Sequence, residues 1–197
     1  EDVVADLPEK IEDTVVAQLT GEQRKLYLAN QDRIAQQVQH RESSEFKKDK
    51  LKVLAELTKL RQICCDPRLH YEDYKAGSAK LDTCMELVHG ALDGGHRILL
   101  FSQFTGMLDI IGKRLAKEDI AFFKLTGASS KESRAKMVAQ FQEGEVPVFL
   151  ISLKAGGVGL NLTAADVVIH YDPWWNVAAQ DQATDRAHRI GQQHTVT

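Results

Sequence analysis

The chain has 197 residues, of which 43% are hydrophobic and 27% are charged, and this balance is typical of a globular protein with a buried core. A formal net charge of −3 at pH 7 excludes a chain that is basic throughout, so any nucleic-acid contact requires a local cationic patch. No apolar run reaches the about 20 residues of a membrane span, and the first residues do not resemble a signal peptide. Three cysteines without a framework spacing predict reduced thiols, so we expect an intracellular protein that makes no membrane contact.

The chain from about residue 20 to residue 66 is polar and predicts a helical region. Thr20 and Gln23 have the spacing of a capping box at a helix start, and Pro67 is a stop signal. Between them, leucines recur at the spacing of an amphipathic helix, at Leu51, Leu54, Leu57 and Leu60. We interpret this region as a structural element that covers one side of a core.

From about residue 79, short apolar runs alternate with amphipathic stretches. The apolar runs predict strands at 97–101, 121–127, 147–152 and 166–172. They show little polar alternation, as expected when helices cover both faces of a parallel sheet. After the second strand, Ser129 and Glu132 predict a capping box. The fold class is therefore predicted to be α/β with a doubly wound parallel sheet, in which ligands bind at the carboxyl ends of the strands.

A glycine-rich loop, "SLKAGGVGLN" (152–161), follows the third predicted strand. Its glycines allow backbone amides to approach a phosphate or a sugar, although a tight turn between a strand and a helix has the same composition. The chain contains no Gly-Lys-Ser/Thr string and no G-x-G-x-x-G at this loop, so neither a P-loop nor a dinucleotide site is supported. We expect that this chain alone does not hydrolyse a nucleotide in the P-loop manner.

The motif "DPWWN" (172–176) places two adjacent tryptophans at a strand end, and either both lie in the core or at least one faces solvent or an interface. Cys64 and Cys65 with His70 lack a second ligand pair at zinc spacing, so no metal site is predicted.

The stretch "QATDRAHRIGQ" (182–192) places Arg186 and Arg189 three residues apart. On a helix both would lie on one face, and two parallel guanidiniums require an anion between them, such as a phosphate or a carboxylate. Ion pairs with Asp181 and Asp185 are the structural alternative. His188 has no Ser or Cys nucleophile beside it, so we do not expect it to be catalytic.

The strings "RILLFSQF", "KLTGASSKESR", "FLISLKAGGVGLNLTAADVVIHYDPWWN" and "QATDRAHRIGQ" together resemble motifs IV, V and VI of the second RecA-like lobe of SWI/SNF-type ATPases, which are superfamily-two DNA translocases. The resemblance implies a RecA-like fold preceded by a helical extension. It divides the chain into residues 1–78, an N-terminal segment with a helical subdomain, and residues 79–197, the core that carries the three motifs.

The resemblance also implies roles for individual residues. Arg186 and Arg189 match arginine fingers that reach the γ-phosphate of ATP, and Gln182 supports them. A segment that packs near the nucleotide is matched by Gly157, Gly159 and Asn161. Positions that line or lie near the DNA track are matched by Ser102, Gln103, Thr126, Gly127, Ser152, Lys154, Trp174 and Trp175. Arg134 matches a family position whose role the sequence does not assign.

In the family, ATP and Mg²⁺ are held mainly by lobe one, which this sequence lacks. We therefore expect the fragment to be inactive alone and to work with lobe one, double-stranded DNA and, in chromatin remodellers, nucleosomes. The location is then the nucleus in a eukaryote, or the cytoplasm and nucleoid otherwise. The alternatives are an RNA helicase lobe, a non-catalytic interaction module whose arginines form salt bridges, and a Rossmann-type oxidoreductase.

Overall fold

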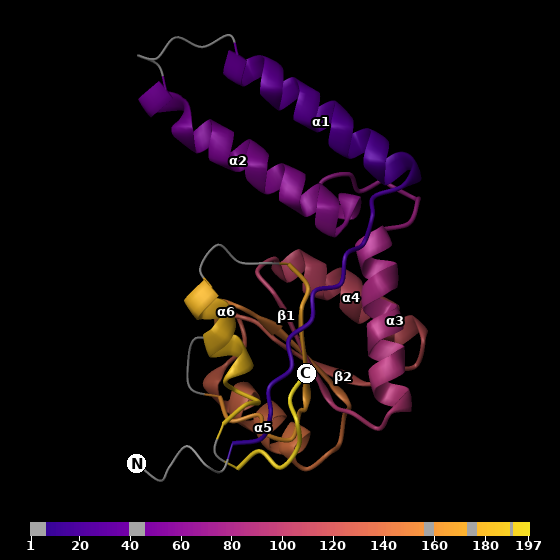
Figure 1. Ribbon diagram of the computed structural model, residues 1–197, viewed down its shortest axis with the longest axis vertical. Coiled ribbons are helices and arrows are strands. Elements are labelled where there is room, and N and C mark those ends of the chain that lie inside the picture. Colours follow the sequence, from indigo (N-terminus) through magenta and orange to yellow (C-terminus); the bar gives the residue numbers. More distant parts are fainter. Residues whose placement is uncertain (1–6, 40–45, 156–159, 173–176, 190) are drawn as a thin grey trace. The chain divides into compact units, whose positions relative to one another are not determined.

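The computed structural model describes residues 7–39, 46–155, 160–172, 177–189 and 191–197. The chain forms two compact units (Figure 1). A core unit contains Glu1–Val15 and Glu86–Thr197, and a helical unit contains Val16–Met85. The predicted boundary at residue 79 remains an interpretation of the sequence, because the compact units divide at other positions.

The helical unit is built on α1 (Gly21–Gln39) and α2 (Phe46–Cys65), which lie side by side and are joined by an ion pair between Arg33 and Glu56 (Figure 1). A short 3₁₀ helix, η1 (Pro67–Leu69), follows, and the unit ends within α3 (Ala79–Asp93). The predicted helices and the stop before Pro67 are confirmed. No helix in the described ranges is long and apolar enough to span a membrane.

The amphipathic face of α2 is buried only toward its C-terminal end. Ile63 is fully buried, but Leu51, Leu54 and Leu57 are 78%, 49% and 39% exposed. The spacing therefore predicted the helix correctly. The interpretation of the whole region as an element that covers one side of a core stays a prediction, and these three leucines are exposed in the described structure.

The predicted role of Gln23 in a capping box is also wrong. Its buried side chain donates from Nε2 to the carbonyl of Ile63 (2.9 Å) and accepts at Oε1 from the amide of Ala79 (3.0 Å). The end of α2 and the start of α3 leave backbone groups without helical partners, and Gln23 satisfies one at each. One side chain thereby joins three helices.

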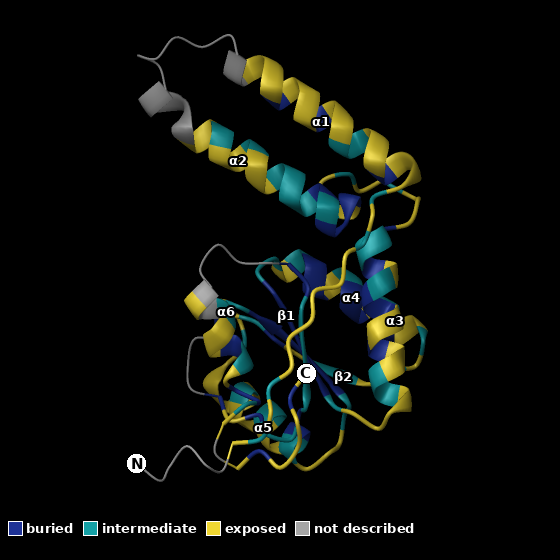
Figure 2. Cartoon of the chain, in the orientation of Figure 1, coloured by how far each residue is buried: buried dark blue, intermediate teal, exposed yellow. Residues whose placement is uncertain are grey.

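The core unit contains a parallel sheet of four strands in the order β2-β3-β1-β4. The strands are β1 (Ile98–Ser102), β2 (Phe122–Leu125), β3 (Val148–Ser152) and β4 (Val167–His170). All five residues of β1 and of β3 are buried, which requires cover on both faces (Figure 2). The four predicted strands and their parallel arrangement are confirmed.

Helices cover both faces of this sheet: α4 (Thr105–Lys117), α5 (Lys131–Gln142) and α6 (Val177–Thr184) (Figure 1). Phe141 of α5 and Ala183 of α6 belong to one apolar cluster with Phe149 of β3. The next strand residue, Leu150, points the other way, since a Cβ added at Gly112 of α4 would lie 3.6 Å from its Cδ1. The α/β fold with helices on both faces is confirmed.

Both ends of the described chain extend the sheet beyond β4. The amide of Val168 donates to the carbonyl of Thr197 (2.7 Å), so the C-terminal residues lie along the edge of β4. Residue Lys10 forms a parallel bridge with Val196, in which the amide of Ile11 donates to Val196 (2.9 Å). Residues 7–15, here called the N-terminal segment, are therefore part of the core unit and not of the helical unit.

The expected capping box at the start of α5 is wrong by one residue. The N-cap is Ser130, whose hydroxyl accepts from the amide of Ser133 (3.1 Å). Ser129 instead accepts from the amide of Thr126 (3.1 Å), because the turn after β2 needs a partner for that amide. This bond fixes the turn that carries Thr126 and Gly127.

Candidate functional site

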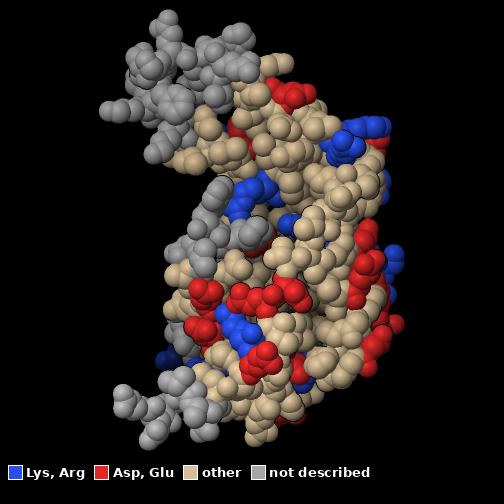
Figure 3. All heavy atoms as spheres, in the orientation of Figure 1, with Lys and Arg blue, Asp and Glu red and all other residues tan. Residues whose placement is uncertain are grey.

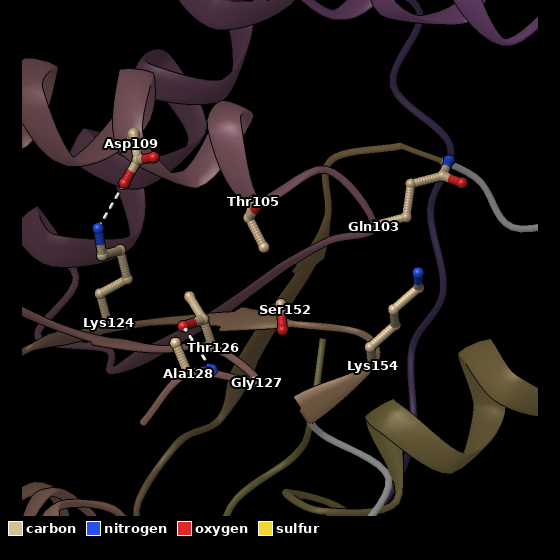
Figure 4. Close-up of a pocket in the computed structure, with 9 residues that line it drawn as sticks. All are labelled: Gln103, Thr105, Asp109, Lys124, Thr126, Gly127, Ala128, Ser152 and Lys154. Atoms are coloured by element: carbon tan, nitrogen blue, oxygen red, sulfur yellow. Dashed lines mark hydrogen bonds and ion pairs between the residues drawn. The ribbon is translucent and has the colours of Figure 1, made fainter. Parts of the chain in front are cut away.

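A cavity of about 390 Å³ lies at the carboxyl ends of β1, β2 and β3 (Figure 4). The strand register explains its position, because Ser102 pairs with Ser152 and Leu125 pairs with Ile151, so the three strands end at similar levels. The loops that follow therefore converge at one edge. The cavity is lined by Gln103, Thr105, Asp109, Lys124, Thr126, Gly127, Ala128, Ser152 and Lys154.

Most of the positions predicted to line a DNA track are brought together by this cavity. Its lining includes the predicted Gln103, Thr126, Gly127, Ser152 and Lys154. The other lining residues, Thr105, Asp109, Lys124 and Ala128, were not predicted from the sequence. Thr105 and Asp109 lie in the first turns of α4, and Lys124 lies one residue before the end of β2. Their nearness in sequence to the ends of β1 and β2 is the signal that could have identified them.

The two lysines of the cavity have different surroundings. Lys124 forms an ion pair with Asp109, as Figure 4 shows. Lys154 is exposed, and no ion pair to it is found among the described residues. Gln103 contributes an amide nitrogen, Nε2, that is buried and has no hydrogen-bond partner in the described part of the chain. Of these two groups, the exposed Lys154 ammonium is the one that an external phosphate oxygen can reach in this structure.

Ser102 is not among the residues that line the cavity, so its predicted place on the DNA track stays a prediction. Ser102 is fully buried and donates its hydroxyl proton to Asp172, while its oxygen accepts from the amide of Phe104 (3.1 Å). The other oxygen of Asp172 accepts from the amide of Gln103 (3.1 Å). Asp172 follows β4 and fixes the start of the loop after β1 through these two hydrogen bonds. The sequence did not predict this role.

The two arginines of the last motif do not lie on a helix. Helix α6 ends at Thr184, and the amides of Ala187 (3.0 Å) and His188 (3.1 Å) both donate to the carbonyl of Thr184. The chain tightens into a turn there, and the predicted common helical face is wrong. Arg186 is buried at 5% exposure, whereas Arg189 is exposed. Residues 185–189 are called the arginine turn.

Arg186 has an unusual electrostatic environment. Its Nε is buried and has no partner among the described residues. Burial lowers the pKa of its guanidinium, and the charge of Asp185 opposes this effect. Neither Asp181 nor Asp185 lies within ion-pair distance of either arginine in the described structure, so the predicted alternative of local salt bridges is not supported. The buried guanidinium therefore keeps one N–H donor without an acceptor in the described part of the chain, which is costly unless a partner is supplied.

The backbone of the arginine turn is held by bonds from several segments. The amide of Leu162 donates to the carbonyl of Arg186 (3.1 Å). The buried side chain of Gln192 donates to the carbonyls of Ala187 (3.0 Å) and Ala165 (2.8 Å). The ring of His188 bonds to the carbonyl of Pro8 (2.8 Å). A turn held in this way presents its side chains in a fixed geometry.

The remaining predicted site residues are only partly described. Gly157, Gly159, Trp174 and Trp175 lie outside the described residues. Asn161 and Gln182 are both exposed. The structure gives Arg134 a contact that the sequence could not assign, since its Nη1 donates to the carbonyl of Ala155 (3.1 Å) at the start of the glycine-rich loop.

Comparison with known proteins identifies the family. Residues 79–191 match the helicase conserved C-terminal domain family. The putative ATP-dependent helicase/translocase YwqA of Bacillus subtilis is 40% identical over 204 residues, which cover 100% of this chain and 22% of that protein. The chain thus spans about a fifth of the length of this relative.

Two solved structures have the same fold at a similar identity. The Sulfolobus solfataricus SWI2/SNF2 ATPase core in complex with double-stranded DNA is 36% identical, with a TM-score of 0.82 over 98% of this chain and 41% of that one. A Sulfolobus solfataricus SWI2/SNF2 ATPase C-terminal domain is also 36% identical, with a TM-score of 0.77 over 86% of this chain and 75% of that one. The chain therefore belongs to the helicase conserved C-terminal domain family, as the second RecA-like lobe of the SWI/SNF type.

Proposed function

We propose that this lobe is one half of an ATP-dependent motor that moves along double-stranded DNA, in a translocase or a chromatin-remodelling ATPase. The observation that carries the proposal is the cavity in which Gln103, Ser152 and Lys154 converge with the turn at Thr126 and Gly127. Hydroxyls, an amide, a lysine and loop amides are the groups that bind phosphates without reading base sequence. A related SWI2/SNF2 core was solved with double-stranded DNA, which supports this choice of ligand.

On this proposal, the arginine turn acts on the nucleotide. ATP would be held mainly by lobe one, where Mg²⁺ would neutralise phosphate charge. Arg186 and Arg189 would approach the γ-phosphate when the two lobes close, with Gln182 as a supporting polar group. Guanidiniums placed in this way stabilise the charge that develops on the transferred phosphoryl group. The buried, unsatisfied Nε of Arg186 is compatible with this role, because this donor has no acceptor among the described residues.

The two sites together give a stepping mechanism. Closure of the lobes would bring the arginine turn to the nucleotide, and opening after hydrolysis would withdraw it. The cavity would hold backbone phosphates in one state and release them in the other, so that the duplex advances while it stays paired. Exposed Lys154 would supply part of the attraction, which salt should weaken.

The first experiment is ATP hydrolysis by the full-length protein, with and without duplex DNA, in Arg186→Ala and Arg189→Ala. Each change should reduce turnover by about a thousandfold, the size of effect that arginine fingers produce. Arg114→Ala is the matched control, because Arg114 lies on α4 and pairs with Glu118. Normal turnover in both variants, with the chain folded, would refute the proposal and favour an interaction module.

A second experiment tests the DNA ligand. Lys154→Gln should weaken duplex binding for all sequences and reduce the slope of log affinity against log salt by about one. Stimulation of hydrolysis by duplex DNA in preference to single-stranded RNA separates this proposal from an RNA helicase lobe. An unchanged salt slope would remove Lys154 from the DNA contact.

A further inference from the structure

The N-terminal segment touches the arginine turn through one side chain. Nε2 of His188 lies 2.8 Å from the carbonyl oxygen of Pro8, across 180 positions of sequence. A carbonyl oxygen only accepts hydrogen bonds, so Nε2 carries a proton and donates it. His188 stands between Arg186 and Arg189, and the contact therefore joins the segment to the centre of the motif.

Pro8 is held in place by the sheet pairing beside it. The amide of Val196 donates to the carbonyl of Glu9 (3.0 Å), and the amide of Ile11 donates to the carbonyl of Val196 (2.9 Å). The bonded carbonyl of Pro8 is thus one residue from a fixed point of the extended sheet. A displacement of the segment would move this carbonyl, and the hydrogen bond would then shift the imidazole of His188.

Charge also attracts the segment toward α6 and the arginine turn. The pKa of Lys10 is raised chiefly by its bond to Glu12, and the carboxylates of Asp181 and Asp185 add to the shift. Acidic side chains gather around basic ones on the face shown in Figure 3. This electrostatic attraction acts in the same direction as the hydrogen bond between His188 and Pro8 and does not involve His188.

The backbone of the turn is otherwise held by Leu162 and Gln192 of the core unit. The carbonyls of Arg186 and Ala187 accept from Leu162 and from the Gln192 side chain, and that of Arg189 accepts from the Gln192 amide (3.0 Å). Those bonds fix the turn from one side. In the described part of the turn, His188 is the residue whose side chain bonds to the N-terminal segment.

We propose that His188 is a positioning residue for Arg186 and Arg189, and that the N-terminal segment is the element against which it positions them. The inference rests on the proposed action of the arginines on ATP. The N-terminal segment lies outside residues 79–191, which match the family model. On this proposal, the placement of the arginine turn therefore depends on residues that the family model does not include. Movement of residues 7–11 would then change the placement of both guanidiniums.

The test compares His188→Ala, His188→Gln and His194→Ala in the full-length protein. His188→Ala should lower the turnover number with duplex DNA by about tenfold, with the KM for ATP within about twofold, since misplacing a catalytic group affects the reacting state. Glutamine places an amide near the position of Nε2 and should restore turnover to within about threefold. His194 is the matched control, because it is exposed and its backbone amide donates to Gln192.

Hydrogen exchange supplies a readout that does not depend on activity. In His188→Ala, the amide of Ile11 should exchange about tenfold faster than in the wild type, while the amides of β1 and β3 keep their rates. Wild-type turnover in His188→Ala, or a glutamine variant as slow as the alanine variant, would overturn the inference.

These outcomes are distinct from failure of the proposed function. If Arg189→Ala and Arg186→Ala hydrolyse ATP normally, the arginines have no role in turnover and the proposed function fails first. If the arginine variants are inactive while His188→Ala is normal, only the positioning role of His188 is wrong.

Discussion

Asp172 offers a direct test of how the cavity is built. Its two carboxylate oxygens accept from the hydroxyl of Ser102 and the amide of Gln103, and the residue as a whole is 3% exposed. In Asp172→Ala the amide of Gln103 loses its acceptor, while the Ser102 hydroxyl can turn to the carbonyl of Phe104, which is 3.3 Å away. One unsatisfied, partly buried amide and the loss of a charge-assisted bond together cost about 2–3 kcal/mol.

Asp172→Asn separates hydrogen bonding from charge. A rotated amide can still accept from Gln103 and can donate to the oxygen of Ser102, so the cost should be about 1 kcal/mol. Urea unfolding of both variants measures these values, and duplex affinity of the full-length protein reports the position of Gln103. We expect affinity to fall in the order wild type, asparagine, alanine. An alanine variant as stable as the wild type would refute this account, because the buried amide would then have found another partner.

Two further predictions concern titratable groups. Burial lowers the pKa of His170 below its ordinary 6.5, so the unfolded state binds its proton at a higher pH than the folded state. The free energy of unfolding should therefore fall as pH drops through about 6.5, and His170→Gln should reduce that dependence in urea titrations at pH 5 to 7. Burial also raises the pKa of Cys84 to about 12, so iodoacetamide at pH 8 should leave Cys84 unmodified in the folded chain. Mass spectrometry should show alkylation of Cys84 only after denaturation, and alkylation of the native chain at Cys84 would contradict its burial.

The sequence predicted the core sheet well because its pattern depends on local burial. The runs 98–101 and 148–151 are apolar at every position, and a strand covered on both faces needs that pattern. The N-terminal segment gave no such signal. Its bridge to Val196 depends on pairing across the whole chain, which composition does not record.

Capping predictions failed where side chains had stronger partners elsewhere. Gln23 has the correct spacing for a capping box, but it bonds to Ile63 and Ala79, far along the chain. Ser129 likewise serves the amide of Thr126, which leaves the cap to Ser130. Two residues at capping-box spacing can form the local hydrogen bonds of a cap, but tertiary contacts determine whether those bonds form.

The sequence predicted the site residues that lie at strand ends. It did not predict the residues that position other segments through hydrogen bonds to their backbone. Lys154 and Gln103 follow directly from the parallel topology, because carboxyl ends of neighbouring strands meet at one edge. Asp172 and Gln192 act by holding backbone groups of distant loops. Their amino-acid type alone does not identify those partners.

The different burial of the two arginines has a consequence for the proposed motor. Arg186 has already lost much of its hydration in the folded lobe, as its lowered pKa indicates, so an anion that reaches it meets a cation with little water to displace. Arg189 is exposed and must lose its water when a nucleotide approaches. Arg186 is therefore suited to recognise the phosphate at low desolvation cost, whereas the contribution of Arg189 depends on how tightly the lobes close. Both arginines belong to one turn, which is held by hydrogen bonds to Leu162, Gln192 and Pro8. A movement of this turn would therefore move the buried Arg186 and the exposed Arg189 together.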